Sequence, residues 1–178
     1  MTEEEIIAGC KSQNRQAQKF LYEQYAPILF PISRRYVKHR EDAEDVLLDA
    51  FYKIFSNINQ YQGKGSFEGW MKRIVVNESL MFLRKRHNFN VNLDVVTHSI
   101  HDDDHNIEEL LFEQDIVRLI QQLPTGYRTV FNLYVIEGYK HREIAEELDI
   151  SINTSKSQLI QAKRKLGQML KKNKRLVV

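Results

Sequence analysis

The residues with the clearest chemistry are polar and basic side chains on a predicted helix of residues 151–166. They are Lys156, Ser157, Gln158, Gln161, Lys163 and Arg164. Hydroxyl and amide groups hydrogen-bond to base edges, whereas lysine and arginine bind phosphates, so this mixture is typical of a helix that lies in a DNA major groove. Apolar residues of the same helix are expected to face inward; they are Ile152, Leu159, Ala162 and Leu166.

A shorter predicted helix precedes this one and is joined to it by a tight turn. Ile144, Ala145 and Leu148 recur at helical spacing. Asp149 tolerates the left-handed conformation that ends a helix, and Ser151 is a good N-cap for the next one. The pattern predicts a helix-turn-helix, whose second helix reads a major groove. An ordinary helical hairpin with a solvated polar face is the alternative.

Residues 41–58 predict the most regular helix of the chain. Its apolar stripe consists of Val46, Leu47, Ala50, Phe51, Ile54, Phe55 and Ile58. Asp42, Asp45 and Asp49 are spaced three and four residues apart, so their carboxylates share the opposite face. They indicate either a solvated acidic face or a docking surface for a basic partner. Metal binding is disfavoured, because no histidine or cysteine adds a ligand to that face.

A polar loop of residues 57–66 leads into a predicted helix with a basic outer edge that extends to residue 86. A polar loop beside such a helix suits a single nucleic-acid strand whose bases are unstacked. The candidate contacts are Asn59, Tyr61, Gln62, Lys64, Ser66, Lys72, Arg73, Asn77, Arg84 and Arg86. Phe67 and Trp70 follow the apolar spacing of the helix, which favours a place in the core over base stacking.

Residues 87–117 contain eight acidic residues and no lysine or arginine. Helical periodicity is missing until residue 107, so residues 88–109 are predicted to form a flexible acidic linker. The linker contains a cluster of metal-ligand types: His98, His101, Asp102, Asp104 and His105. A flexible segment lacks the fixed geometry that a metal site needs, so we expect neither a metal nor another cofactor.

The remaining apolar patterns predict an all-α protein of two small helical domains, residues 1–87 and 110–178, with the helix-turn-helix in the second. The other helical patterns cover residues 3–25, 28–37, 107–122 and 126–137. Pro27 and Pro31 are expected to interrupt or restart the helix between the first two patterns.

The charge distribution is more informative than the net charge of +2. From residue 150 to the end there are eight basic residues and no acid, and residues 71–86 have five basic residues against Glu78 alone. These segments suggest two surfaces that face nucleic acid. A single cysteine, an N-terminus rich in glutamate and the lack of a long apolar run predict a cytoplasmic protein without direct membrane insertion.

Two blocks of sequence together resemble one family. Residues 123–139 and 142–166, which include Arg142-Glu-Ile-Ala-Glu-Glu-Leu, are similar to the C-terminal promoter-binding domain of bacterial extracytoplasmic-function (ECF) sigma factors. Residues 20–26, 40–46 and 67–77 are similar to the N-terminal domain of that family, and the third of these segments begins Phe67-Glu-Gly-Trp. The two blocks stand in the family's order, with a linker of the right length between them.

The resemblance implies a protein that binds core RNA polymerase and directs it to promoter DNA, with no enzymatic activity and no small-molecule substrate. It implies that Asp42, Asp45 and Asp49 dock on the polymerase and that the loop of residues 57–66 and the following helix capture the melted −10 strand. The implied contacts with the −35 duplex are Ser155, Lys156, Ser157, Gln158, Gln161, Lys163, Arg164 and Lys165. An anti-sigma factor is a usual partner in the family.

The chain departs from the family pattern at several positions. Leu48 and Asp49 stand where Gln and Glu are frequent, Ser155 replaces a common valine, and Gln158 replaces a common arginine. The −35 preference therefore cannot be transferred from other members. The alternative function is a one-component helix-turn-helix regulator that acts without polymerase, which would leave the acidic helix and the basic helix unexplained.

Overall fold

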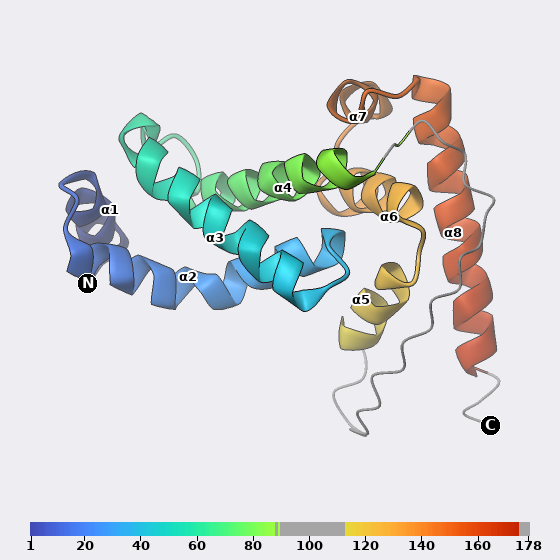
Figure 1. Ribbon diagram of the computed structural model, residues 1–178, viewed down its shortest axis with the longest axis horizontal. Helices are drawn as coiled ribbons and strands as arrows, with labels where there is room; N and C mark the ends of the chain where they lie inside the picture. The colour runs from blue at the N-terminus through green and yellow to red at the C-terminus, as the bar shows by residue number, and fades with distance from the viewer. Residues whose placement is uncertain (88, 90–112, 175–178) are drawn as a thin grey trace. The chain divides into compact units, whose positions relative to one another are not determined.

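The computed structural model describes residues 1–87, 89 and 113–174, and all regular secondary structure in these residues is helical. The chain divides into two compact units, Met1–Arg86 and His87–Val178, and each contains its own packed helices (Figure 1). The predicted all-α class with two helical domains is confirmed. The predicted linker, apart from Phe89, lies outside the described residues.

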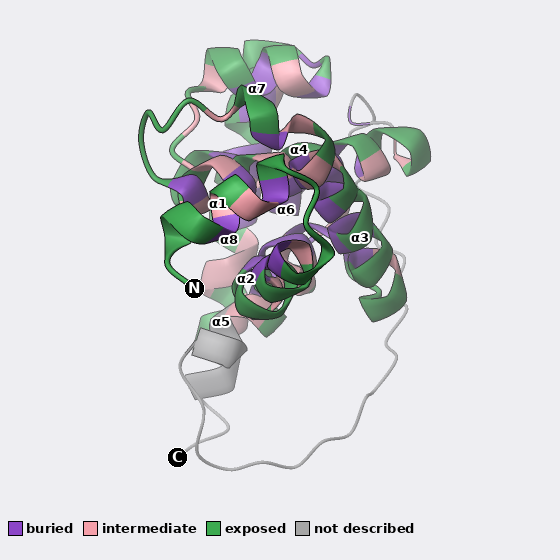
Figure 2. Cartoon of the chain, turned by 90° about the vertical axis from the view of Figure 1, so that its left-hand side faces the viewer, coloured by how far each residue is buried: buried purple, intermediate pink, exposed green. Residues whose placement is uncertain are grey.

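The first unit contains the helices α1 (Glu3–Lys11), α2 (Arg15–Tyr36), α3 (Arg40–Asn57) and α4 (Phe67–Arg86), and the short 3-10 helix η1 (Ile58–Gln60). Helices α2, α3 and α4 pack against one another, while α1 packs against α2 and η1. The core side chains include Leu21, Leu29, Ile54, Met71 and Val75. Each helix has a buried side and an exposed side (Figure 2). Helices α3 and α4 and the segment between them carry the predicted contacts of this unit.

Helix α2 runs through Pro27 and Pro31, so the predicted interruption at these prolines is wrong. Each proline lacks the N–H that would bond to the carbonyl four residues earlier. Both prolines are exposed, so the carbonyls that they leave free lie on the solvent side of the helix. The opposite side of α2 is buried through Tyr25, Leu29 and Ile32, and this packing keeps the helix continuous.

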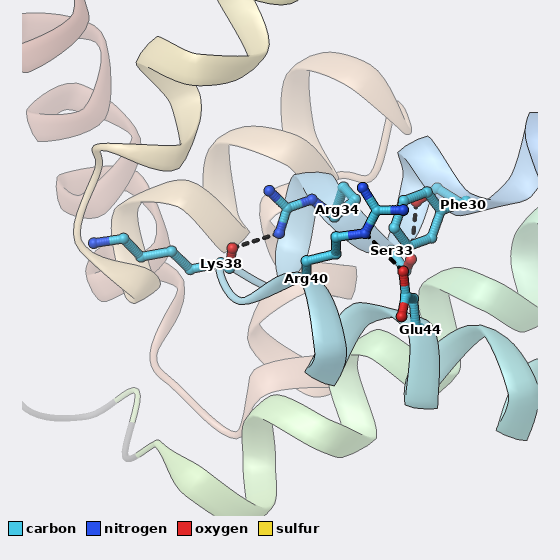
Figure 3. A network of polar contacts seen from close by, with 6 residues as sticks. All are labelled: Phe30, Ser33, Arg34, Lys38, Arg40 and Glu44. Carbon is cyan, nitrogen blue, oxygen red and sulfur yellow. Dashed lines mark hydrogen bonds and ion pairs between the residues drawn. The ribbon is translucent and has the colours of Figure 1, made fainter. Parts of the chain in front are cut away.

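The corner between α2 and α3 is held by local polar contacts (Figure 3). The Ser33 hydroxyl donates to the Phe30 carbonyl at 2.9 Å, and the Arg34 guanidinium donates to the Lys38 carbonyl. At the start of α3, Arg40 pairs with Glu44 at 2.8 Å, and its guanidinium lies 5.7 Å from the centre of the Phe30 ring. Of these contacts, the one between Arg40 and the Phe30 ring joins the start of α3 to α2.

The described part of the second unit contains α5 (Glu113–Gln121), α6 (Thr125–Phe131), the π-helical turn η2 (Asn132–Ile136), α7 (His141–Leu148) and α8 (Ile152–Lys174). One apolar cluster is formed by Leu123, Tyr127 and Ala162, with Phe131, Leu166 and Met169 packed against it. Thus α8 is attached to the domain core along its middle and later turns. Its first turns are positioned by the turn that follows α7.

The predicted helix-turn-helix is present in α7 and α8. Asp149 has φ 52° and ψ 49°, the predicted left-handed conformation, and the Ser151 hydroxyl accepts a hydrogen bond from the Thr154 amide at 2.9 Å. The prediction that Ile152 points inward is wrong, because its side chain is 44% exposed. The buried stripe of α8 begins one turn later, at Ser155.

Candidate nucleic-acid and protein interfaces

The exposed face of α8 presents a continuous stripe of side chains, here called the α8 stripe. It consists of Lys156, Ser157, Ile160, Lys163 and Arg164. Their spacing of three and four residues places them on one side of the helix. Four of the five were predicted DNA contacts, whereas Ile160, which is 64% exposed, was missed. An exposed aliphatic group between polar readers suits contact with a thymine methyl group.

Two other predicted DNA contacts on α8 are buried. Ser155 is 0% exposed, and its hydroxyl lies 2.9 Å from Nδ1 of His141. Gln158 is 3% exposed, and its side-chain amide donates to the Phe89 carbonyl at 3.1 Å. A Cβ at Gly126 would lie only 3.1 Å from Oε1 of Gln158, so the glycine leaves room for this amide. Packing within the domain therefore occupies both side chains, and neither is exposed to solvent.

The two remaining predicted −35 contacts lie at the edge of the α8 stripe. Gln161 is half-buried. Lys165 is also half-buried, and its ammonium group lies 5.8 Å from the centre of the Tyr127 ring. A cation over an aromatic face is held by the ring. The ammonium group of Lys165 therefore lies against Tyr127 of the domain's own core and is not counted in the α8 stripe.

His141 connects the N-terminus of α7 to α8. Its ring stacks on Tyr134, with centroids 4.5 Å apart and planes inclined by 23°. Burial lowers the pKa of His141, and the nearby charges of Lys156 and Lys163 lower it further. A neutral ring with an unprotonated Nδ1 can accept a hydrogen bond there from the hydroxyl of Ser155. The contact is a polar link between the two helices of the motif.

The exposed face of α3 combines acidic and apolar side chains, here called the α3 face. Asp45 and Asp49 are exposed, as predicted for docking residues. Between and beside them lie Leu48, 55% exposed, and Tyr52, 74% exposed. Sequence reasoning missed Tyr52, because it considered only the carboxylates as docking groups on this face. Its position four residues after Leu48 was the available signal, since these two share a face.

The third predicted docking carboxylate, Asp42, is already paired within the domain. Nη1 of Arg86 lies 3.0 Å from both carboxylate oxygens of Asp42, and the Asp42 side chain is 23% exposed. The same guanidinium lies 4.3 Å from the centre of the Phe82 ring. Asp42 and Arg86, predicted to bind polymerase and DNA respectively, therefore join α3 to the end of α4.

Helix η1 and the loop that follows it expose most of their predicted contacts with the melted DNA strand. Asn59, Gln62, Lys64 and Ser66 are exposed. Ser66 also caps α4, as its hydroxyl accepts from the Gly69 amide at 3.2 Å. Phe67 is 1% exposed, which confirms its predicted place in the core, whereas Trp70 is only half-buried.

Helix α4 continues this polar surface with a second stripe. Arg73, Asn77 and Arg84 are exposed at spacings of four and seven residues, which places them on one side of the helix. Lys72 lies on a neighbouring side, where its ammonium group pairs with Glu68 at 2.6 Å. The loop and this stripe together form a surface of amide, ammonium and guanidinium groups suited to a nucleic-acid backbone.

In the part of the chain that the structure describes, no group of three or more metal-ligand side chains is found. The histidine cluster considered from the sequence, His98 to His105, lies outside it. No described helix is long and apolar enough to span a bilayer.

Comparison with known proteins identifies the family. The model of Sigma-70 region 2 matches residues 21–89, and the model of Sigma-70, region 4 matches residues 113–166. The ECF RNA polymerase sigma-E factor of Haemophilus influenzae is 27% identical over 176 residues, which cover 92% of each chain. The ECF RNA polymerase sigma factor SigE of Mycolicibacterium smegmatis is 27% identical over 158 residues, which cover 86% of this chain and 61% of that relative. The chain belongs to the ECF sigma factors.

A solved structure supports the fold of this sigma factor. The sigma factor RpoE of Bartonella quintana, in complex with the anti-sigma factor NepR, matches 86% of this chain and 96% of its own, with a TM-score of 0.50 and 22% sequence identity. As a sigma factor, the protein binds core RNA polymerase and directs promoter-specific transcription initiation. The α3 face, the loop and the α4 stripe fall within region 2, and the α8 stripe falls within region 4.

Proposed function

We propose that this sigma factor divides its work among three surfaces. The α3 face, with Asp45 and Asp49, docks on core polymerase. The loop after η1 and the α4 stripe capture the melted −10 strand. The α8 stripe reads the −35 element in duplex form. Ser155 and Gln158 are left out of the DNA contacts, because both are buried.

The observation that carries the proposal is the division of charge between exposed faces. Within the first unit, α3 exposes carboxylates, whereas α4 exposes Arg73 and Arg84. Like charges would repel a nucleic-acid strand from α3, so a single DNA-binding surface cannot include both helices. Carboxylates on one helix and cations on another therefore support two different partners, a basic protein surface and DNA.

The protein catalyses no reaction in this proposal. Binding energy released at the bases of the opened −10 strand offsets part of the cost of unstacking, about 1.4 kcal/mol per base step. Phosphate contacts from Lys163 and Arg164 position the second domain, and Ser157, Ile160 and Gln161 distinguish base pairs. The protein acts in the cytoplasm, where core polymerase is found. It also binds an anti-sigma factor, as RpoE does in its complex with NepR.

The test is in-vitro transcription with core polymerase and a library of genomic promoter fragments. The expected result is initiation from a small set of fragments that share −35 and −10 elements, and only when the sigma factor is added. Specific binding of duplex DNA by the chain alone, without stimulation of transcription, would instead indicate a one-component regulator.

A further inference from the structure

Tyr61, predicted from the sequence to contact the melted strand, is tied to its own domain by three separate interactions. It stands at the start of the loop that joins η1 to α4. Its ring, its hydroxyl and its backbone carbonyl each have a partner on a different element. Because these interactions occupy most groups of Tyr61, few remain to contact a nucleic acid. The interactions instead connect the loop to the rest of the domain.

The ring of Tyr61 belongs to an aromatic cluster at the start of α4. Its centroid lies 5.0 Å from that of Phe67 and 5.5 Å from that of Trp70, and the latter two rings stack at 5.7 Å and 17°. Phe67 also meets Tyr25 of α2 edge to face at 6.0 Å. Rings in such contact stabilise one another beyond their buried area. A base that stacked on Tyr61 from within the cluster would have to displace Trp70 or Phe67.

The hydroxyl of Tyr61 closes the loop. It donates to the carbonyl of Gly65, four residues later, at 2.8 Å. Gly63 and Gly65 have φ values of +73° and +85°, which side chains rarely adopt, and no atom lies within 4 Å of where a Cβ would stand on either. Backbone conformation rather than crowding therefore requires glycine at both positions. The result is a closed loop whose tip, Gln62 to Lys64, faces open space.

The carbonyl of Tyr61 is held from the N-terminal helix. Nζ of Lys11, in the last turn of α1, donates to this carbonyl at 3.2 Å. Helix α1 packs against η1, the element directly before the loop. Residues 1–14, which precede the region 2 match, therefore reach the loop through one defined hydrogen bond.

From these contacts we infer that Tyr61 and Lys11 are positioning residues that hold the loop of residues 61–66 in one shape before DNA arrives, so that Gln62 and Lys64 meet the displaced −10 strand. This inference rests on the proposed function of the loop. A segment that is ordered beforehand loses less conformational freedom on binding than a free one, and it presents its contacts in a fixed geometry. Fixed geometry distinguishes one base from another; a loose loop binds the strand with less discrimination.

The test uses Tyr61→Phe in the full chain, assembled with core polymerase. This change keeps the ring and removes only the hydroxyl. The probe is a promoter fragment with a pre-opened −10 region, in which each −10 base is replaced in turn. We expect the ratio of affinities between the preferred base and its replacements to fall about two- to tenfold, the effect of one net hydrogen bond. Lys11→Met should reduce the same ratio by a smaller factor.

Tyr22→Phe is the matched control, because Tyr22 is a partly exposed tyrosine of the same domain whose ring packs on Phe51 at 4.7 Å. It should leave the ratio unchanged. The inference is overturned if Tyr61→Phe binds every base variant as the wild type does, or weakens all of them by one common factor. If Tyr61→Phe fails to fold, Lys11→Met decides, since Lys11 is exposed. A wild-type holoenzyme that shows no base preference at any −10 position would instead refute the proposed function of the loop.

Discussion

The α3 face and the α8 stripe are built alike and differ in the sign of their charge. Each presents an exposed apolar centre, Leu48 with Tyr52 on α3 and Ile160 on α8. Carboxylates flank the first centre, and lysine and arginine flank the second. Charge at the rim of an interface selects the partner and speeds association, while apolar groups at its centre contribute more of the affinity or discrimination. Under the proposed division of roles, the negative rim of the α3 face suits a basic protein surface, and the positive rim of the α8 stripe suits DNA.

The strongest test of this comparison is to remove the apolar centre of the α3 face. We expect Tyr52→Ala to weaken binding to core polymerase by about 2 kcal/mol, roughly 30-fold, because exposed tyrosines at interface centres are frequent hot spots. The measurement is a titration of core polymerase with labelled sigma factor. Ile28→Ala, which shortens a 41% exposed side chain on α2, is the matched control and should have no effect. An equal loss of affinity for core polymerase in the two variants would show that Tyr52 is not part of the docking surface.

The equivalent change on the DNA side should have a smaller and more selective effect. Ile160→Ala is expected to cost about 1 kcal/mol at a single base pair of the −35 element, where the aliphatic group is lost, and little elsewhere. Holoenzyme binding to a set of −35 variants measures it.

Lys163→Gln provides the contrast within the α8 stripe. Because it removes a charge that we propose contacts phosphate, it should weaken binding to all sequences alike and reduce the salt slope by about one. If Ile160→Ala gave this uniform pattern instead, the apolar centre of α8 would not read bases.

Gln158 and Gln161 of α8 differ in burial, so substituting each tests whether base reading requires exposure. Gln158→Leu should leave the −35 preference unchanged and shift stability by less than about 1 kcal/mol, since it replaces a buried amide that makes one hydrogen bond. Gln161→Ala should alter the preference at one position by about 1–3 kcal/mol. A changed base preference in Gln158→Leu would mean that Gln158 leaves the core when the domain binds DNA.

Most of the fold could be predicted from the sequence, because helices and turns are indicated by residues close together in the chain. The helix-turn-helix was predicted from the spacing of Ile144, Ala145 and Leu148. The left-handed conformation at the turn was predicted from Asp149, and the start of the second helix from Ser151. The failure at Pro27 and Pro31 has a physical cause: a local preference against proline was outweighed by burial of the other side of α2, which only the packed domain shows.

The candidate site was less predictable, because burial of a polar side chain depends on distant residues. Ser155 and Gln158 look like surface residues in the sequence. Their partners, His141 and the carbonyl of Phe89, lie 14 and 69 residues away in the sequence. Helical spacing does not indicate contacts at such separations. Likewise Asp42 has the spacing of an exposed acid, yet Arg86, 44 residues later, pairs with it.

The smallest expected effect is a difference between the two units in how their stability depends on pH. Burial is the main cause that lowers the pKa of both His87 and His141, and both belong to the second unit. When the folded pKa is lower, the unfolded chain binds more protons, so stability is greatest above the unfolded value near 6.5 and falls as the pH drops below it. Amide hydrogen exchange of the full chain between pH 7.5 and about pH 5 should show protection in α6 to α8 decreasing more than protection in α2 to α4. His141→Gln should reduce this difference. Equal loss of protection in both units would show that these histidines do not govern the pH response.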